Sequence, residues 1–158
     1  MGKETERKFR VDEEEAAAWR KAPYREVRQG YLSMDKDRTV RVRIAGNEAW
    51  LTIKGITRGA SRAEYEYPIP IADAGEMLDH LCLRPLIDKR RYRVEHEGFL
   101  WEIDEFYEDN AGLIIAEIEL ESANQAFPRP PWVGAEVTHD PRYYNASLVR
   151  HPYSRWKS

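Results

Sequence analysis

Alternation of apolar and charged side chains is the main pattern along this chain. In a β-strand, successive side chains point to opposite faces, so residues two positions apart share a face. Val40 and Val42 therefore lie on one face of a predicted strand, whereas Arg41 and Arg43 lie on the other. The same spacing of charged residues recurs at Glu4, Glu6 and Lys8, at Glu64 and Glu66, at Lys89 and Arg91, at Glu102 and Asp104, and at Glu117 and Glu119. We therefore predict a chain built mainly of strands that have one apolar and one ionic face.

Turn-forming residues divide this pattern into separate strands, with two or three helices between them. The strands are expected at about 4–11, 25–33, 39–45, 49–56, 63–71, 87–95, 99–107 and 113–121. Helices are expected at 13–21, where Asp12 and Glu15 resemble a capping box, in the segment that Asp73 caps, and at 142–149. The apolar stripe of the second helix consists of Met77, Leu78, Leu81 and Cys82. Loops are expected at 55–61 and around the prolines at 128, 130 and 131.

The order of these elements predicts a mainly β fold with flanking helices, in the α+β class. Strands joined by short turns in hairpin order indicate an eight-stranded antiparallel sheet closed into a barrel, as one domain over residues 1–158. An ordinary small barrel would fill its interior with the apolar face. Here the ionic faces consist almost wholly of Glu, Asp, Arg and Lys, and burying such charges is costly unless they are paired or bound to a ligand. We therefore favour a barrel whose charged faces line the lumen while helices cover the apolar face from outside.

Composition excludes several classes of function. The charged fraction is 34% but the net charge is only −3, so the chain lacks the basic excess of a general nucleic-acid-binding protein. A single cysteine, Cys82, excludes an internal disulfide and fits a reducing cytoplasm. No apolar run reaches the length of a membrane span, and the charged N-terminal residues do not resemble a signal peptide. The expected protein is cytoplasmic, without nucleic-acid or membrane partners; a homodimer is compatible with the sequence.

The charged positions also resemble a known family. Glu4-x-Glu6-x-Lys8 matches the ExExK signature of the CYTH superfamily, the triphosphate tunnel metalloenzymes, which includes bacterial inorganic tripolyphosphatases. The remaining positions follow in the order that the family uses: Arg41-x-Arg43, Lys54, Glu64-x-Glu66, Lys89-x-Arg91, Asp104 and Glu117-x-Glu119. The resemblance covers nearly the whole chain. It implies an eight-stranded antiparallel tunnel whose lumen binds a triphosphate and divalent cations.

The resemblance implies a role for each charged group. Arginine offers a planar fork to two phosphate oxygens, and lysine offers a compact charge. The residues expected to bind the phosphates are Lys8, Arg41, Arg43, Lys54, Lys89 and Arg91. Carboxylates supply the hard oxygen ligands that Mg²⁺ or Mn²⁺ prefers. The expected metal ligands are Glu4, Glu6, Asp104, Glu117 and Glu119.

The expected catalytic group comprises Glu4, Glu6, Lys8, Glu64, Glu66 and Tyr31. Glu64 and Glu66 are candidates either for activating the attacking water or for orienting the basic residues. Tyr31 shares a strand face with Gln29, and the resemblance implies a position in the lumen from which it would hydrogen-bond Lys89. Glu102 is expected in the wall or at the rim. The segment 143–148 resembles the family's C-terminal helix, and either closes or lines the tunnel or only packs against the barrel.

Two classes of enzyme fit this scaffold. The first is a hydrolase acting on inorganic tripolyphosphate or on a nucleoside or thiamine triphosphate; the second is a class IV adenylyl cyclase, which belongs to the same superfamily. We favour tripolyphosphate hydrolysis because the sequence shows no insertion that would form a base or ribose pocket. A non-catalytic polyphosphate or nucleotide sensor is disfavoured because all four end-strand glutamates are present.

Overall fold

A single antiparallel sheet forms the body of the protein. The computed structural model describes residues 5–12, 17–58, 61–122 and 124–156. The sheet has nine strands in the order β5-β4-β3-β2-β6-β7-β8-β1-β9. Their bounds are β1 (Thr5–Val11), β2 (Tyr24–Asp35), β3 (Arg38–Ala45), β4 (Glu48–Arg58), β5 (Ser61–Pro68), β6 (Ile87–His96), β7 (Phe99–Phe106), β8 (Ile114–Leu120) and β9 (Val133–Glu136). The predicted antiparallel β fold with flanking helices is confirmed.

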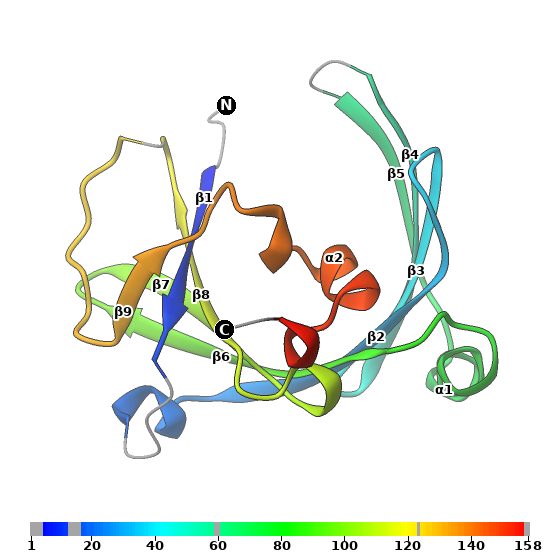
Figure 1. The fold of residues 1–158 in the computed structure, drawn as a ribbon, viewed down its shortest axis with the longest axis horizontal. Coiled ribbons are helices and arrows are strands. Elements are labelled where there is room, and N and C mark those ends of the chain that lie inside the picture. The colour runs from blue at the N-terminus through cyan, green and yellow to red at the C-terminus, as the bar shows by residue number, and fades with distance from the viewer. Residues whose placement is uncertain (1–4, 13–16, 59–60, 123, 157–158) are drawn as a thin grey trace.

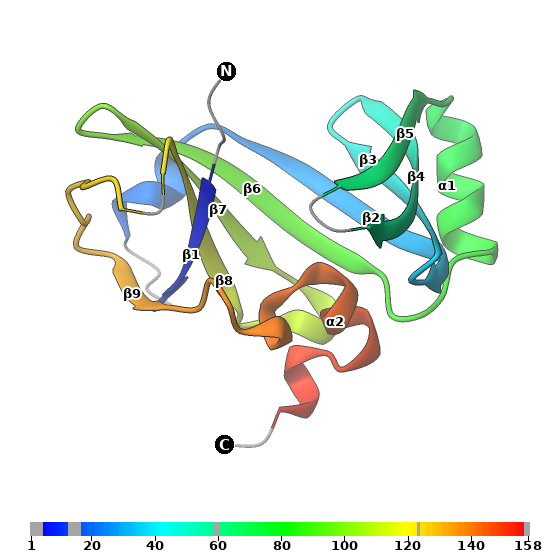
Figure 2. The same ribbon diagram turned by 90° about the horizontal axis from the view of Figure 1, so that it is seen from above.

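The helices are short and lie at different places on the sheet. They are α1 (Ile71–His80) and α2 (Asn145–Arg150), with single 3-10 turns at Ala18–Lys21, Glu108–Asn110, Pro141–Tyr143 and Tyr153–Arg155. Figure 1 shows a strongly curved sheet with α2 inside the curve and α1 outside it, beside β2 and β3. Viewed from above, α2 lies at one end of the curved sheet (Figure 2). None of the helices in the described ranges has the length and apolarity needed to span a bilayer.

Closure of the sheet differs from the expected barrel. The edge strands are β5 and β9, and no hydrogen-bonded ladder joins them in the described part of the chain. They lie on opposite sides of an opening in Figure 1. The sheet is therefore a deep open trough rather than a barrel closed by hydrogen bonds.

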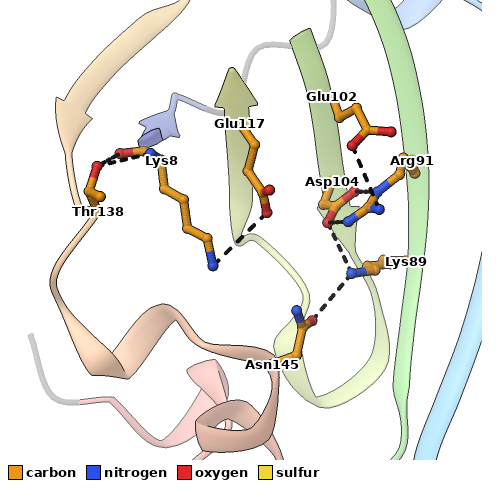
Figure 3. A network of polar contacts seen from close by, with 8 residues as sticks. All are labelled: Lys8, Lys89, Arg91, Glu102, Asp104, Glu117, Thr138 and Asn145. Carbon is orange, nitrogen blue, oxygen red and sulfur yellow. Dashed lines mark hydrogen bonds and ion pairs between the residues drawn. The ribbon is translucent and has the colours of Figure 1, made fainter. Parts of the chain in front are cut away.

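The ionic faces of the strands share the concave side of the trough. Directly opposed residues on antiparallel strands project to the same face. Lys8 on β1 opposes Glu117 on β8, which opposes Glu102 on β7. On the neighbouring strands Arg91 opposes Asp104. The predicted inward orientation of the charged faces is confirmed, because these side chains lie on the side that α2 occupies (Figure 3).

Apolar side chains cover the convex side in two clusters. One joins Val42 and Ala49 of the sheet to Ala74 and Leu78 of α1. The other cluster surrounds the fully buried ring of Trp101 and consists of Phe9, Val11, Trp19, Tyr92, Ile103, Ile114, Ala116, Ile118 and Leu120. Each large apolar side chain so buried stabilises the fold by about 1.5–3 kcal/mol. The sheet thus obtains its stability from its outside, which leaves the concave side for charges.

A third apolar cluster lies inside the trough, under the C-terminal segment. Leu148 of α2 packs with Tyr31, Ile87 and Phe106 of the sheet, and Tyr143 joins them. This cluster fills one end of the concave side, where β2 and β6 contribute the apolar side chains of Tyr31 and Ile87 instead of charged ones. The predicted alternative that α2 lines the trough is therefore confirmed, although α2 also packs on the sheet.

The first predicted helix is wrong in its described part. Residues 13–16 lie outside the described ranges, and Ala17 has an extended backbone, so only the turn Ala18–Lys21 is helical. Its buried Trp19 packs edge-on against Tyr92. That tertiary contact decides the local conformation, rather than the helix propensity of the alanines.

The second helix begins and packs differently from the prediction. Its N-cap is Pro70, and Asp73 lies within the first turn. Leu78 and Cys82 are buried with Met77 packed beside them, as predicted, but Leu81 is 66% exposed and the fully buried Ala74 completes the apolar stripe. The predicted loop at 55–61 is also shorter, since β4 continues to Arg58 and β5 begins at Ser61.

Strand β9 was not predicted, because four residues after a proline-rich loop show no clear alternation. The strand exists because it pairs with the free edge of β1. A Cβ atom at Gly134 would lie 2.8 Å from the Arg10 carbonyl oxygen, so this close approach requires glycine. Arg7 and Glu136 then fix the pair, with an Arg7 Nε to Glu136 Oε2 distance of 2.8 Å.

Candidate active site

The middle of the trough holds a compact ionic cluster from β6 and β7 (Figure 3). Arg91 donates from Nε and Nη2 to the two carboxylate oxygens of Asp104, both at 2.8 Å. Lys89 Nζ lies 3.0 Å from Asp104 Oδ2 and donates to Asn145 Oδ1 of α2 at 3.3 Å. The Lys89 side chain has no exposed surface. Asp104 thus pairs with both cations, and Arg91 Nη1 also lies 3.8 Å from Glu102 Oε1.

Burial and these contacts shift the protonation equilibria of the cluster. Burial raises the pKa of Asp104, but the charge of Lys89 and the hydrogen bonds from Arg91 outweigh it and hold that pKa well below its usual value. Burial lowers the pKa of Lys89 to about 8, against the opposing attraction of Asp104. Burial also lowers the pKa of Arg91, but its hydrogen bonds to Asp104 reverse that effect and raise it. The carboxylate is firmly ionised and engaged on both oxygens.

Arginines of β3 extend the basic surface. Arg43 Nε donates to Gln29 Oε1 at 2.8 Å. Arg41 Nη2 lies 3.5 Å from the hydroxyl of Thr52 and 3.9 Å from Glu66 Oε2. Burial, together with the like charges of Arg41 and Arg91, lowers the pKa of Arg43 to about 10. Positive charge is therefore concentrated here beyond what nearby carboxylates compensate.

The predicted carboxylates of β5 lie beside cations. Glu66 accepts a hydrogen bond from Thr52 at 2.9 Å, and Glu64 Oε1 lies 3.7 Å from Lys54 Nζ. Both carboxylates are about half exposed. Their position next to Arg41 and Lys54 favours the predicted role of orienting the basic residues.

The opposite side of the trough is acidic. Glu6 on β1 opposes Glu119 on β8. Lys8 Nζ lies 4.0 Å from Glu117 Oε1 and 5.2 Å from the centre of the Tyr144 ring. Burial, followed by a hydrogen bond with Glu6, raises the pKa of Glu117 to about 7, although Lys8 opposes the shift. Three carboxylates, Glu6, Glu117 and Glu119, thus gather around Lys8 on this side of the trough.

Two adjoining cavities in the trough differ in the charge of the residues that border them. A cavity of about 230 Å³ is bordered by four arginines and two glutamates: Arg25, Arg43, Arg91, Arg93, Glu66 and Glu102. A second cavity, of about 460 Å³, is bordered by Glu6, Glu102, Glu117 and Glu119. Arg93 and Glu102 border both. A mainly basic hollow thus adjoins a mainly acidic one.

The predicted metal ligands divide between these regions. Glu6, Glu117 and Glu119 border the acidic cavity, whereas Asp104 lies in the cationic cluster. Glu4 lies outside the described residues. In the described ranges, no three His, Cys, Asp or Glu side chains converge closely enough to hold a metal ion. The oxygen donors of the acidic cavity nevertheless have the chemistry that Mg²⁺ or Mn²⁺ prefers.

Tyr31 lies on the concave face, opposite Arg41, but its predicted bond to Lys89 is wrong. Among described residues, Lys89 Nζ bonds Asp104 and Asn145 instead. The Tyr31 ring is 6% exposed and belongs to the apolar cluster with Leu148. Burial raises its pKa, against the charges of Arg41 and Arg43.

Several contributors were not assigned from the sequence. Arg25 and Arg93 border the basic cavity, Gln29 and Thr52 hold arginines, and Asn145 contacts Lys89. The alternation of side chains along a strand places Arg25, Gln29, Thr52 and Arg93 on the ionic face, because each lies an even number of positions from a predicted site residue on the same strand. Asn145 depends on how α2 enters the trough.

Comparisons with known proteins agree with this geometry. The CYTH domain family model matches residues 2–153. An inorganic triphosphatase of Acetivibrio thermocellus is 50% identical over 157 residues, covering 99% of each chain. An inorganic triphosphatase of Nitrosomonas europaea is 39% identical over 127 residues, covering 78% of this chain and 83% of that protein. The crystal structure of the inorganic triphosphatase NE1496 superposes with a TM-score of 0.76 at 33% identity, covering 94% of this chain and 95% of that one.

Proposed function

The chain belongs to the CYTH domain family, and from this premise we propose that it is a metal-dependent inorganic triphosphatase. The substrate is inorganic tripolyphosphate, which water cleaves to pyrophosphate and phosphate. The observation that carries the proposal is the pair of adjoining hollows, one bordered by arginines and the other by glutamates. The relatives with the same printed activity cover nearly the whole chain, which supports it.

The basic side of the trough binds the phosphate chain. Arg43 and Arg41 project from β3 toward the same concave face as Lys89 and Arg91 of β6. Tripolyphosphate carries several negative charges along an extended chain, so a row of cations holds it better than a single point. Phosphoryl transfer requires mainly positioning and charge stabilisation from the protein.

The acidic side supplies the oxygen ligands. We propose that Glu6, Glu117 and Glu119, with Glu4, hold Mg²⁺ or Mn²⁺ beside the phosphate chain. When bound, the cation neutralises phosphate charge and lowers the pKa of bound water. Asp104 would join this set through Oδ1, which accepts one hydrogen bond, from Arg91 Nε, whereas Oδ2 contacts both Arg91 and Lys89.

The remaining groups position the reactants. Lys8 lies on the acidic side, so its ammonium reaches phosphate oxygens from the face opposite Arg91. Glu64 and Glu66 hold Lys54 and Arg41 in place. In the reaction, the attacking water forms a bond to the terminal phosphorus while the bridging oxygen leaves with pyrophosphate. Cys82 is a buried free thiol, in keeping with the reducing cytoplasm that we propose as the location.

A substrate comparison tests this function. Enzyme stripped with EDTA is assayed with tripolyphosphate, ATP and thiamine triphosphate, with and without Mg²⁺ or Mn²⁺, and products are separated by ion chromatography. We expect tripolyphosphate to be cleaved to phosphate and pyrophosphate with the highest kcat/KM of the three substrates, because the contacts that we propose are all to phosphate oxygens. Full turnover without a cation would refute the metal requirement, and cyclic AMP as the main product from ATP would replace the hydrolase with a cyclase.

A further inference from the structure

Gln29 is a fully buried polar side chain in the wall of the trough. Its Oε1 accepts the hydrogen bond from Arg43 Nε at 2.8 Å. A guanidinium group only donates, so the amide oxygen must face Arg43 and the amide nitrogen must point elsewhere. The two residues are directly opposed on β2 and β3, which fixes their approach.

The buried amide of Gln29 lowers the stability of the folded protein. Its Nε2 is buried and has no acceptor in the described part of the chain. A buried donor without a partner lowers stability, whereas an apolar side chain of similar size would not. Packing therefore does not explain why glutamine occupies this position.

The hydrogen bond to Gln29 orients the Arg43 guanidinium group without neutralising its charge, because the acceptor is an uncharged amide. The hydrogen bond uses only Nε, and no described residue bonds the two Nη atoms of Arg43. These atoms form the end of the planar fork that binds two phosphate oxygens. Arg91 is held differently, because Asp104 both orients it and cancels charge.

We propose that Gln29 is a positioning residue that aims Arg43 at the phosphate chain while leaving its positive charge uncompensated. This inference rests on the proposed function. It is supported by the cavity that Arg43 borders together with Arg25, Arg91 and Arg93, where a cation has much to gain from an anionic ligand. It also explains why the partner of Arg43 is a neutral amide rather than a carboxylate.

Two substitutions separate positioning from packing. Gln29→Met removes the acceptor and the unpaired donor at similar volume, so the Tm should stay or rise while KM for tripolyphosphate rises roughly tenfold. Gln29→Glu keeps the hydrogen bond but adds a negative charge, so KM should rise at least as much although Arg43 stays in place. In both variants kcat should change less than KM, because the lost interaction acts on bound substrate as well as on the transition state.

Asn110→Asp is the matched control. Asn110 is also fully buried, accepts from the Tyr153 backbone N–H at 2.8 Å and has an unpartnered Nδ2, but it lies outside the trough wall. The same change from amide to acid there should leave KM unchanged. If that variant unfolds, Asn110→Ala serves instead, with the Tm recorded for every protein.

Anion binding is measured separately as the Tm increase that tripolyphosphate causes in EDTA, without turnover. Both Gln29 variants should show a smaller increase than the wild type and the control. A wild-type KM and a wild-type Tm increase in both variants would overturn the inference, even if hydrolysis by the wild type upholds the proposed function. Absence of tripolyphosphate hydrolysis by the wild type would refute that function instead, while the Tm increase would still decide the role of Gln29.

Discussion

At the scale of single residues, the trough holds its cations in two ways. Arg91 and Lys89 share the ionised Asp104, whereas Arg43, among the described residues, is hydrogen-bonded to the neutral Gln29. A cation held by an acid is firmly placed but partly neutralised, and a cation held by an amide keeps its full attraction for an anion. Loss of the Arg43 side chain should therefore weaken substrate binding strongly, although Arg43 makes a single hydrogen bond to the described part of the protein.

Arg43→Lys tests that dependence. Lysine keeps the charge but loses the planar fork and the Nε contact to Gln29, so kcat/KM for tripolyphosphate should fall by an amount equivalent to about 1.5–3 kcal/mol. Steady-state kinetics measure the loss. Arg142→Lys, at an exposed residue paired with Asp140, is the control and should be within error of the wild type. Equal kinetics for both variants would mean that Arg43 does not contact the substrate.

Glu117→Gln should change stability in a pH-dependent way. The pKa of Glu117 in the folded protein, about 7, is above its unfolded value of about 4.3, so its ionised form is disfavoured by folding. This cost is absent at low pH, grows as the pH rises between those values and is complete above the folded pKa. In metal-free buffer at pH 8, the variant should therefore melt above the wild type, by at most roughly 15 °C.

Thermal unfolding at two pH values measures this effect. At pH 5 the two proteins should melt at nearly the same temperature, which serves as the internal control. Added Mg²⁺ should stabilise the wild type more than the variant. A variant that melts below the wild type at pH 8 would contradict the predicted cost of ionising Glu117 in the folded protein.

Charge spacing predicted which residues face the trough, but not how they pair. Arg43 was identifiable because Arg41-x-Arg43 alternates with valines. Its bond to Gln29 depends on the register between β2 and β3, which turn geometry and a bulge in β2 set and which no local pattern reveals. Likewise the engagement of Asp104 by Arg91 follows from the β6–β7 register, so a metal ligand and a structural acid look alike in the sequence.

At the scale of elements, the two helices have opposite tasks. α1 packs Leu78 on the convex side, and α2 inserts Leu148 into the trough. Alternation predicted the strands well because each strand has one buried face. It missed β9 and misplaced the first helix, because contacts with distant residues form both.

Leu78→Ala and Leu81→Ala form a matched pair on α1. Leu78 is fully buried, so its truncation should lower the free energy of unfolding by about 2–5 kcal/mol. Leu81 is 66% exposed, and its truncation should cost no more than about 0.5 kcal/mol. Urea denaturation measures both. Because α1 lies outside the trough, kcat/KM at low temperature should be unchanged in each folded variant. A large loss of unfolding free energy in Leu81→Ala would mean that Leu81 is buried after all, as the sequence pattern predicted.

Asn145→Ala tests the contribution of α2 to the site. Asn145 accepts from Lys89 at 3.3 Å, so the variant should leave the buried ammonium with Asp104 alone and raise KM for tripolyphosphate severalfold. Ser147→Ala on the same helix is the control and should not change KM. Unchanged KM in both would assign α2 a packing role only.

At the scale of the whole molecule, charge is ordered across the sheet. On the concave face, Arg41, Arg43 and Arg91 lie on β3 and β6. Carboxylates lie on β7 (Glu102 and Asp104) and toward both margins of the sheet: Glu64 and Glu66 on β5, and Glu6, Glu117 and Glu119 on β1 and β8. The curvature places these two margins on opposite sides of the opening (Figure 1). The order follows from strand topology, which explains why a linear sequence shows acids and bases only as separate pairs.

The edge strands β5 and β9 are not joined by a ladder in the described part of the chain, so we expect a ligand that contacts both sides of the trough to draw them together. Salt alone should have a smaller effect, because it screens charges without bridging the two sides. We expect the radius of gyration from small-angle X-ray scattering to fall most with Mg²⁺ and tripolyphosphate together, and less with NaCl alone. An unchanged radius in every condition would mean a rigid trough. The gap between β5 and β9 is thus the part of the molecule that we expect to narrow around the phosphate chain.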